Sequence, residues 1–277
     1  MPLAIVGASY SIAAFPTLSR LFSSGDRAKF LAHLETAIRH ILFWSLPATA
    51  LFIVLRAQIV RTILGFGEFD WSDTKLTAAC LALFALSAAA QSLTVLFIRA
   101  YYARSNTITP LVINVVSSSL IVLLGYLMVY AFGNVPSLGV FVSSTLRVEN
   151  LRDAQVLALP LAYSIATIFN AVLFWIFFQR DFSSFSRKVW MTLGESIVGA
   201  LAIGAGAYVL LNLLAPFFNL NTAIGIFSQG LIAGLGAVAF GIIVLALFKN
   251  SEQKEIWKTL HSKIWKAKVV AIEQEKL

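Results

Sequence analysis

Apolar residues in this chain fall into runs of about twenty, separated by short polar segments. A helix needs about twenty mostly apolar residues to cross the hydrocarbon core of a bilayer. Six runs reach that length, so the pattern predicts an all-α polytopic membrane protein with six full transmembrane helices. The predicted spans are 40–60, 76–98, 108–132, 158–178, 195–218 and 223–248.

One further apolar run, Leu3–Phe15, is too short to cross a bilayer. A signal peptide has an apolar region of this length. However, no basic residue precedes the run, and Phe15-Pro16 lacks the small residues of a cleavage site. We therefore expect a truncated transmembrane helix, the later part of a span in a longer protein.

The second and third apolar runs, 76–98 and 108–132, are separated by a polar hinge that contains Arg99, Arg104 and Pro110. A charged break this short between two spans predicts a helical hairpin in the membrane. Its arginines are then expected at one water interface.

Two connecting segments have patterns of their own. In 17–39, apolar residues such as Phe30 recur at helical spacing, which predicts an amphipathic helix lying on the membrane surface. The segment 133–157 is rich in Ser and Val and is expected to be a long loop. Between them, Ser72 or Asp73 is expected to cap the helix that follows an acidic turn.

The composition supports lipid as the solvent. Hydrophobic residues make up 59% of the chain and charged residues 12%, whereas a soluble domain is about 25% charged. A net charge of +8 would suit nucleic acid, but the basic residues lie in short segments between apolar runs and in the tail, as the positive-inside rule describes. We therefore expect membrane lipids and no nucleic acid as partners.

The distribution of charge predicts the orientation. Of the 21 Lys and Arg residues, 16 lie in one set of alternating segments and only five in the other. Because cytoplasmic loops carry the excess of Lys and Arg, the C-terminus is expected to be cytoplasmic. The segments expected inside are 16–39, 99–107, 179–195 and 249–277.

The last of these segments, 249–277, is a basic tail in which Ile256, Leu260 and Ile264 repeat every four residues. The spacing predicts a basic amphipathic helix on an anionic inner leaflet. A solvated basic tail fits the same composition.

Candidate chemistry is sparse. There is no Ser/His/Asp set, no Gly-rich phosphate loop and no pair of carboxylates placed for acid–base work. We therefore expect no enzyme, no cofactor and no metal site. Uncharged polar residues inside spans are costly in lipid and so are functional candidates, although hydrogen bonding between helices explains any one of them. The cavity-facing substrate-binding candidates are Gln91, Asn114, Ser164, Thr167 and Asn170.

Several short motifs occur in an order that is similar to a known family. The chain resembles the C-terminal half of the MurJ/MviN family of bacterial lipid II flippases, and past Gly133 the resemblance rests on hydropathy and span count. The matching residues are Phe15-Pro16-Thr17-Leu18-Ser19-Arg20, Gly25-Asp26, Ile59-Val60-Arg61, Gly65, Gly67, Phe69-Asp70, Asp73-Thr74, Tyr102-Ala103 and Thr109-Pro110.

The resemblance implies the fold of the multidrug/oligosaccharidyl-lipid/polysaccharide exporters, with fourteen spans: two six-helix lobes around a central cavity and two extra helices. On this mapping, 1–179 is an incomplete C-terminal lobe, and 180–248 holds the two extra helices, whose groove takes the polyprenyl tail. Glycines such as Gly199 and Gly206 would allow these two helices to pack closely. This chain departs from the family at Ile121 and Gly125, which take the places of a polar pair on the eleventh span.

The resemblance also implies a function. We expect this chain to be the C-terminal part of a transporter that flips lipid II, a polyprenyl-diphosphate-linked glycopeptide, across the bacterial cytoplasmic membrane. An N-terminal half of the transporter is then an expected partner. The alternatives are an exporter of another lipid-linked oligosaccharide or of a drug, and a non-transporting scaffold or remnant.

Overall fold

The computed structural model describes residues 2–65, 67–148, 154–182, 185–220 and 222–247, and within these ranges the regular structure is entirely helical. Short 3₁₀ turns precede α8 and follow α9, at Ala154–Leu157 and Ala215–Phe217. The α-helices are α1 (Pro2–Ser23), α2 (Arg27–Val54), α3 (Arg56–Leu64), α4 (Trp71–Leu86), α5 (Ala88–Ala103), α6 (Ile108–Asn134), α7 (Pro136–Leu146), α8 (Ala158–Asp181), α9 (Arg187–Leu214) and α10 (Ala223–Leu247).

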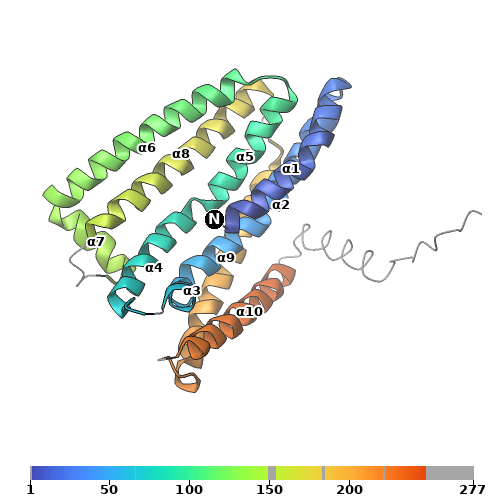
Figure 1. Ribbon diagram of the computed structural model, residues 1–277. Helices are drawn as coiled ribbons and strands as arrows, with labels where there is room; N and C mark the ends of the chain where they lie inside the picture. The colour runs from blue at the N-terminus through green and yellow to red at the C-terminus, as the bar shows by residue number, and fades with distance from the viewer. Residues whose placement is uncertain (1, 66, 149–153, 183–184, 221, 248–277) are drawn as a thin grey trace, which may run out of the picture.

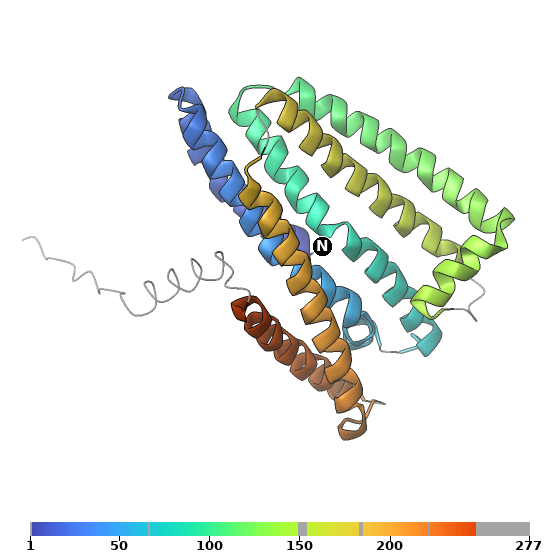
Figure 2. The same cartoon turned by 180° about the vertical axis from the view of Figure 1, so that it is seen from behind.

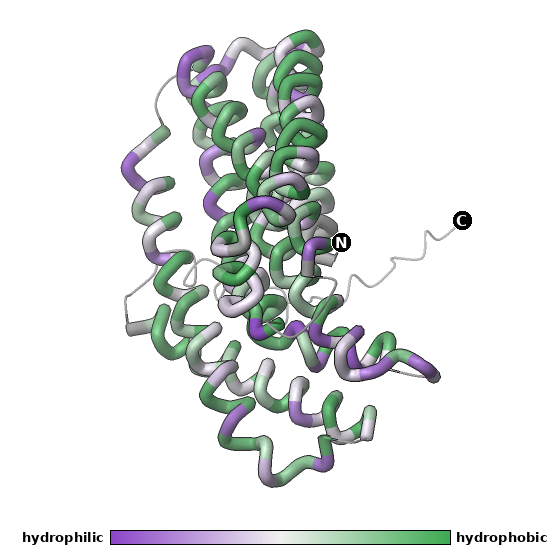
Figure 3. Tube along the Cα trace, turned by 90° about the vertical axis from the view of Figure 1, so that its left-hand side faces the viewer, coloured by the Kyte–Doolittle hydropathy of each residue, from purple (hydrophilic) through white to green (hydrophobic). Residues whose placement is uncertain are grey.

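Six helical stretches of the described residues are long and apolar enough to cross a membrane, and each contains most of one predicted span. The prediction of six membrane-spanning helices is therefore confirmed. Figure 3 shows hydrophobic residues along most of the length of the long helices. The stretches are Arg27–Val54, Trp71–Ala103, Ile108–Asn134, Gln155–Asp181, Arg187–Phe217 and Ala223–Ala246.

The helices form a layered bundle (Figures 1 and 2). Helix α8 packs against both α6 and α5, so it lies between the two helices that the hinge connects. Helix α1 packs against α5 and α2, and α2 packs in turn against α9. Helix α10 contacts α9 and α3. It therefore forms one edge of the bundle, and α6 forms the other.

The first apolar run belongs to a longer helix than the sequence indicates. Helix α1 continues through Pro16 to Ser23 and has 22 residues. The expectation of a truncated helix over 3–15 is wrong in its end point, because hydropathy falls at the polar residues after Phe15 while the backbone remains helical. Pro16 sits inside the helix at the cost of one backbone hydrogen bond.

An aromatic core joins α2, α5 and α8, and it corrects the prediction for segment 17–39. The side chain of Phe30 on α2 is fully buried, and its ring stacks on Phe182 with the centroids 5.5 Å apart. Phe182 stacks in turn on Phe178 at 4.3 Å. The predicted surface helix 17–39 is therefore wrong: residues up to Ser23 end α1, and those from Arg27 are the first part of a membrane-spanning helix. Its apolar stripe contacts neighbouring helices, and the same spacing would serve for contact with lipid.

The bounds of several other elements differ from the prediction. The expected span 40–60 is divided at Leu55, where α2 ends and α3 begins. The expected loop 133–157 contains the 11-residue helix α7, which starts with a proline, a residue suited to the first turn of a helix. The N-cap of α4 is Asp70 rather than Ser72 or Asp73. The predicted tail 249–277 lies outside the described residues.

Glycines allow α9 and α10 to approach closely, as the sequence predicts. A Cβ atom at Gly206 would lie 3.0 Å from the ring of Phe240, and one at Gly199 would lie 3.0 Å from Leu245. Either contact is tighter than most side chains accept. Small residues therefore hold this helix pair together by close packing.

The membrane crossing made by α4 and α5 is interrupted at Ser87, and a side chain from α8 compensates for the break. The Ser87 N–H donates to the carbonyl of Phe84 at 3.2 Å, so the carbonyl of Leu83 loses its usual helical partner. The hydroxyl of Ser164 donates to that carbonyl at 2.6 Å. Because lipid offers no hydrogen bonds to a free carbonyl, Ser164 ties α8 to the break.

We predict that Ser164→Ala destabilises the protein by about 1–2 kcal/mol, because the Leu83 carbonyl is left without a donor in an apolar region. Unfolding of the purified protein in mixed micelles, followed by circular dichroism, measures the change. Ser118→Ala removes the same group from an exposed position of α6 and serves as the control. Equal stability of Ser164→Ala and the wild type would contradict this role.

Candidate functional site

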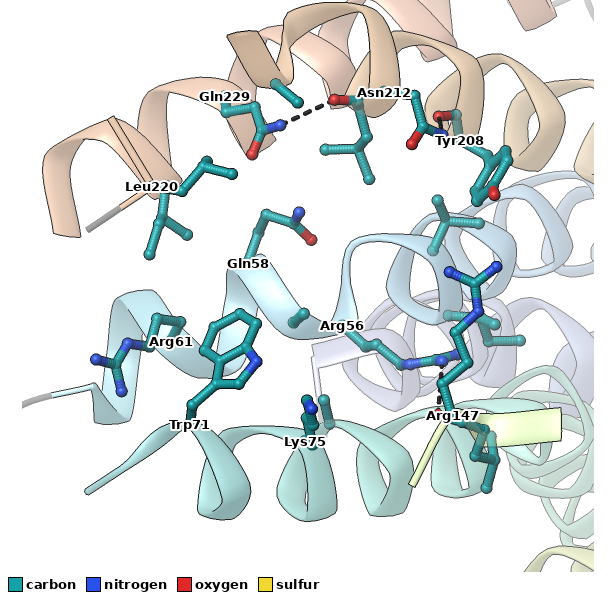
Figure 4. A pocket seen from close by; sticks show the side chains of 18 residues that line it. Arg56, Gln58, Arg61, Trp71, Lys75, Arg147, Tyr208, Asn212, Leu220 and Gln229 are labelled. Atoms are coloured by element: carbon teal, nitrogen blue, oxygen red, sulfur yellow. Dashed lines mark hydrogen bonds between the residues drawn. The ribbon is translucent and has the colours of Figure 1, made fainter. Parts of the chain in front are cut away.

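A pocket of about 550 Å³ opens at the end of the bundle where α2 and α9 end and α4 and α10 begin. Figure 4 shows α3 and α4 on one side of it and α9 and α10 on the other. Four basic residues line this pocket, which we call the basic pocket. They are Arg56, Arg61, Lys75 and Arg147.

The turn between α3 and α4 builds one wall of the basic pocket. Asp70 and Asp73 form a capping box at the start of α4: the Asp70 carboxylate accepts from the Asp73 N–H at 2.9 Å, and the Asp73 carboxylate accepts from the Asp70 N–H at 3.1 Å. Arg61 donates to the carbonyl of Phe69 at 2.9 Å, and its guanidinium lies 6.0 Å from the centre of the Trp71 ring. Asp70 and Asp73 are thus engaged in capping, and Arg61 holds the turn in place.

A second wall comes from the end of α7. Arg147 has a left-handed backbone, with φ of 61°, and its side chain extends toward Tyr208 of α9 (Figure 4). Arg56, on α3, donates from Nη2 to the carbonyl of Leu146 at 3.2 Å. The interruption of the helix at Leu55 and the C-terminal turn of α7 therefore bring two guanidinium groups into one pocket.

The basic pocket contains an excess of positive charge. No carboxylate is among the residues that line it. In the described part of the chain, the ion pairs Lys29–Asp26 and Arg104–Asp181 involve none of its four cations. Burial, and after it the like charge of Arg147, lower the pKa of the Arg56 guanidinium from its usual value. Arginine keeps its proton in proteins nonetheless, so these side chains remain cationic.

The predicted polar hinge is a tight turn between α5 and α6, in agreement with the expected hairpin. Its Arg104 lies 3.5 Å from the carboxylate of Asp181 at the end of α8, and the Tyr101 hydroxyl donates to the same carboxylate at 3.3 Å. Pro110 lies in the first turn of α6, and the guanidinium of Arg99 lies 5.9 Å from the ring of Phe15. The hinge is thus fastened to α8 through one acid.

The five predicted substrate-binding residues lie away from the basic pocket. Asn170 donates to Asn114 at 3.2 Å, which links α8 to α6. Gln91 donates to Ser87 at the break between α4 and α5, and the Ser164 hydroxyl bonds the Leu83 carbonyl there. Thr167 donates to Tyr163 within its own helix. Each makes a hydrogen bond within or between helices, and a substrate-binding role stays a prediction.

The basic pocket itself was not predicted. In the sequence, its four cations are noticeable only as members of the five Lys and Arg residues expected on the outer side. They are up to 91 positions apart, Arg56 to Arg147, so no local motif connects them. The available signal was a weak one: Arg56 and Arg147 are cations at helix ends in the two segments expected outside.

The comparison with known proteins identifies the family. The profile of the family described as "Lipid II flippase MurJ" matches residues 1–228. This chain belongs to the lipid II flippase MurJ family. The family is named for a flippase, which is a transporter, and not for an enzyme. Six apolar helices and this membership make it a multi-pass protein of the bacterial inner membrane.

Alignments with individual MurJ relatives cover most of this chain but less than half of each relative. A probable lipid II flippase MurJ of Thermotoga maritima is 32% identical over 173 residues, 60% of this chain and 36% of that protein. A probable lipid II flippase MurJ of Rhizobium meliloti is 25% identical over 250 residues, 90% of this chain and 42% of that protein. The chain thus spans less than half the length of these relatives.

The fold is that of a solved MurJ. A structure titled "Lipid II flippase MurJ, inward closed conformation" matches with a TM-score of 0.57. The match covers 90% of this chain and 48% of that one at 19% sequence identity, so it shows the fold alone. The all-α fold class predicted from the sequence is therefore confirmed.

We predict that Asp181→Asn loosens the hinge, because Arg104 loses its ion pair and Tyr101 its charged acceptor. Hydrogen exchange followed by mass spectrometry is expected to show faster exchange over residues 99–110. Asp26→Asn, which breaks an exposed ion pair at another turn, is the control. Unchanged exchange over 99–110 in Asp181→Asn would mean that Asp181 does not hold the hinge.

Proposed function

We propose that this chain forms the C-terminal part of a lipid II flippase. The observation that carries the proposal is the family match over residues 1–228, together with a structural likeness that covers 90% of this chain and 48% of a MurJ structure. Coverage of about half of that structure supports one lobe and the additional helices as the identity of this chain. The remaining lobe is then required, on the same polypeptide or as a separate chain.

The mechanism proposed is alternating access. Two lobes rock about a central site, so that a headgroup enters from the cytoplasmic side and leaves on the outer side. In this chain, α4, α5, α6 and α8 form a connected unit, in which Ser164, Asn170 and Asp181 of α8 make contacts to α4, α6 and α5 respectively. Such a unit can move as one body. Helices α9 and α10, packed through glycines, provide the surface proposed for the polyprenyl tail.

Lipid II exposure at the outer face of bacteria depleted of their own flippase tests this function. Cells would express this chain alone, the N-terminal half of a MurJ relative alone, or both, with a full-length MurJ as the positive control. We expect exposure to be restored only when both parts are present. Failure with both parts stably inserted, while full-length MurJ succeeds, would reject lipid II as the substrate and favour another exporter or a remnant.

The proposed orientation places the C-terminus in the cytoplasm, because 16 of the 21 Lys and Arg residues lie in the segments assigned to that side. We expect a green fluorescent protein fused after Leu277 to fluoresce, since this reporter folds in the cytoplasm and not after export. An alkaline phosphatase fusion at the same position is expected to be inactive. The reverse pattern would invert the orientation and place the basic pocket inside.

A further inference from the structure

The basic pocket has four cations in its lining and no carboxylate to balance them. Arg56 and Arg147 carry like charges in one partly buried space, and no carboxylate lines it. The Arg56 side chain is partly buried, so its charge is weakly screened, and the like charge of the exposed Arg147 beside it is unfavourable. An anion placed between them would convert this repulsion into attraction.

The cations also retain donors for a ligand. Among the described residues, the Arg56 guanidinium donates one of its five N–H groups, to the carbonyl of Leu146. The Arg147 side chain reaches from the opposite wall toward Tyr208, and Lys75 lies between Trp71 and Arg147 (Figure 4). Two guanidinium forks on one space match the geometry of phosphate oxygens.

The position of the basic pocket indicates a lipid as the source of the phosphate. It lies where several membrane-spanning helices end, the depth at which a bilayer carries its headgroups. Trp71 and Tyr208 at its rim are 53% and 51% exposed, and both residue types favour this interface. The rest of the lining combines the amides Gln58, Asn212 and Gln229 with apolar side chains such as Leu220 and Ile226, which suits the polar glycerol and the acyl part of a lipid.

We propose that the basic pocket binds the phosphate of an anionic phospholipid headgroup, held by Arg56 and Arg147 with Lys75 as an additional charge. The bound lipid neutralises the pocket and fastens α3, α7 and α9 to one another at this end of the bundle. The proposal goes beyond lipid II flipping and does not depend on it, because a resident lipid would bind whichever substrate the transporter moves.

Native mass spectrometry of the purified full chain tests the proposal. The protein would be titrated in mild detergent with phosphatidylglycerol and, separately, with phosphatidylcholine, whose headgroup has no net charge. We expect a preference for phosphatidylglycerol that falls about tenfold or more in Arg56→Gln/Arg147→Gln, since two charged hydrogen-bond donors are lost. Arg20→Gln/Arg180→Gln removes two exposed arginines elsewhere and is expected to keep the preference.

Further arms keep the result decisive. Arg56→Lys/Arg147→Lys retains the charge but not the fork, so its affinity for phosphatidylglycerol is expected to lie between those of the wild type and the Gln variant. This variant also covers the case in which the Gln variant fails to fold. Equal binding of both lipids, or an unchanged preference in the Gln and Lys variants, would overturn the proposal. Displacement of phosphatidylglycerol by low millimolar inorganic phosphate would overturn the lipid as its source.

Discussion

The structure depends on one requirement of the bilayer: each backbone carbonyl released inside it needs a donor from the protein. The helices break at Leu55 and Ser87, and at the second of these breaks a side chain from another helix supplies the donor. Ser164 of α8 donates to the Leu83 carbonyl, and at the loop ends Arg56 donates to Leu146. Gln229 of α10 donates to Leu211 near the end of α9 in the same way. These polar contacts tie α8 to α4, α3 to α7 and α10 to α9.

Hydropathy was sufficient to find the six membrane-spanning helices, because twenty apolar residues in a row have few other uses. It could not find the helix breaks. Neither Leu55 nor Ser87 is a proline or a glycine. The residues around Ser87 are as apolar as the rest of the span, and Arg56 after Leu55 lies close enough to the span end to be interpreted as an interfacial residue. The break at Ser87 frees the Leu83 carbonyl, and the donor to that carbonyl is Ser164 on α8. Because α8 is far from Ser87 in the sequence, the break is a property of the tertiary structure.

The two largest differences between the sequence-based expectations and the structure have the same origin. Phe30 follows a helical spacing that suits a membrane surface and a protein interior equally, and only the position of Phe182 decides between them. The basic pocket draws its cations from three separate segments, and only the folded chain shows that they meet. For the polar residues within the spans, the sequence offered two explanations, and the structure gives each of the five a hydrogen-bond partner inside the protein.

The backbone of Arg147 has a consequence for how this region can vary. It is one of two non-glycine residues in the described part of the chain with a positive φ, and the other is Ser105. Glycine adopts this conformation without strain, and asparagine does so more easily than arginine. Selection for stability alone would therefore drive this position toward a smaller residue. A glycine at position 147 would relieve this strain but would also remove one of the four cations of the basic pocket.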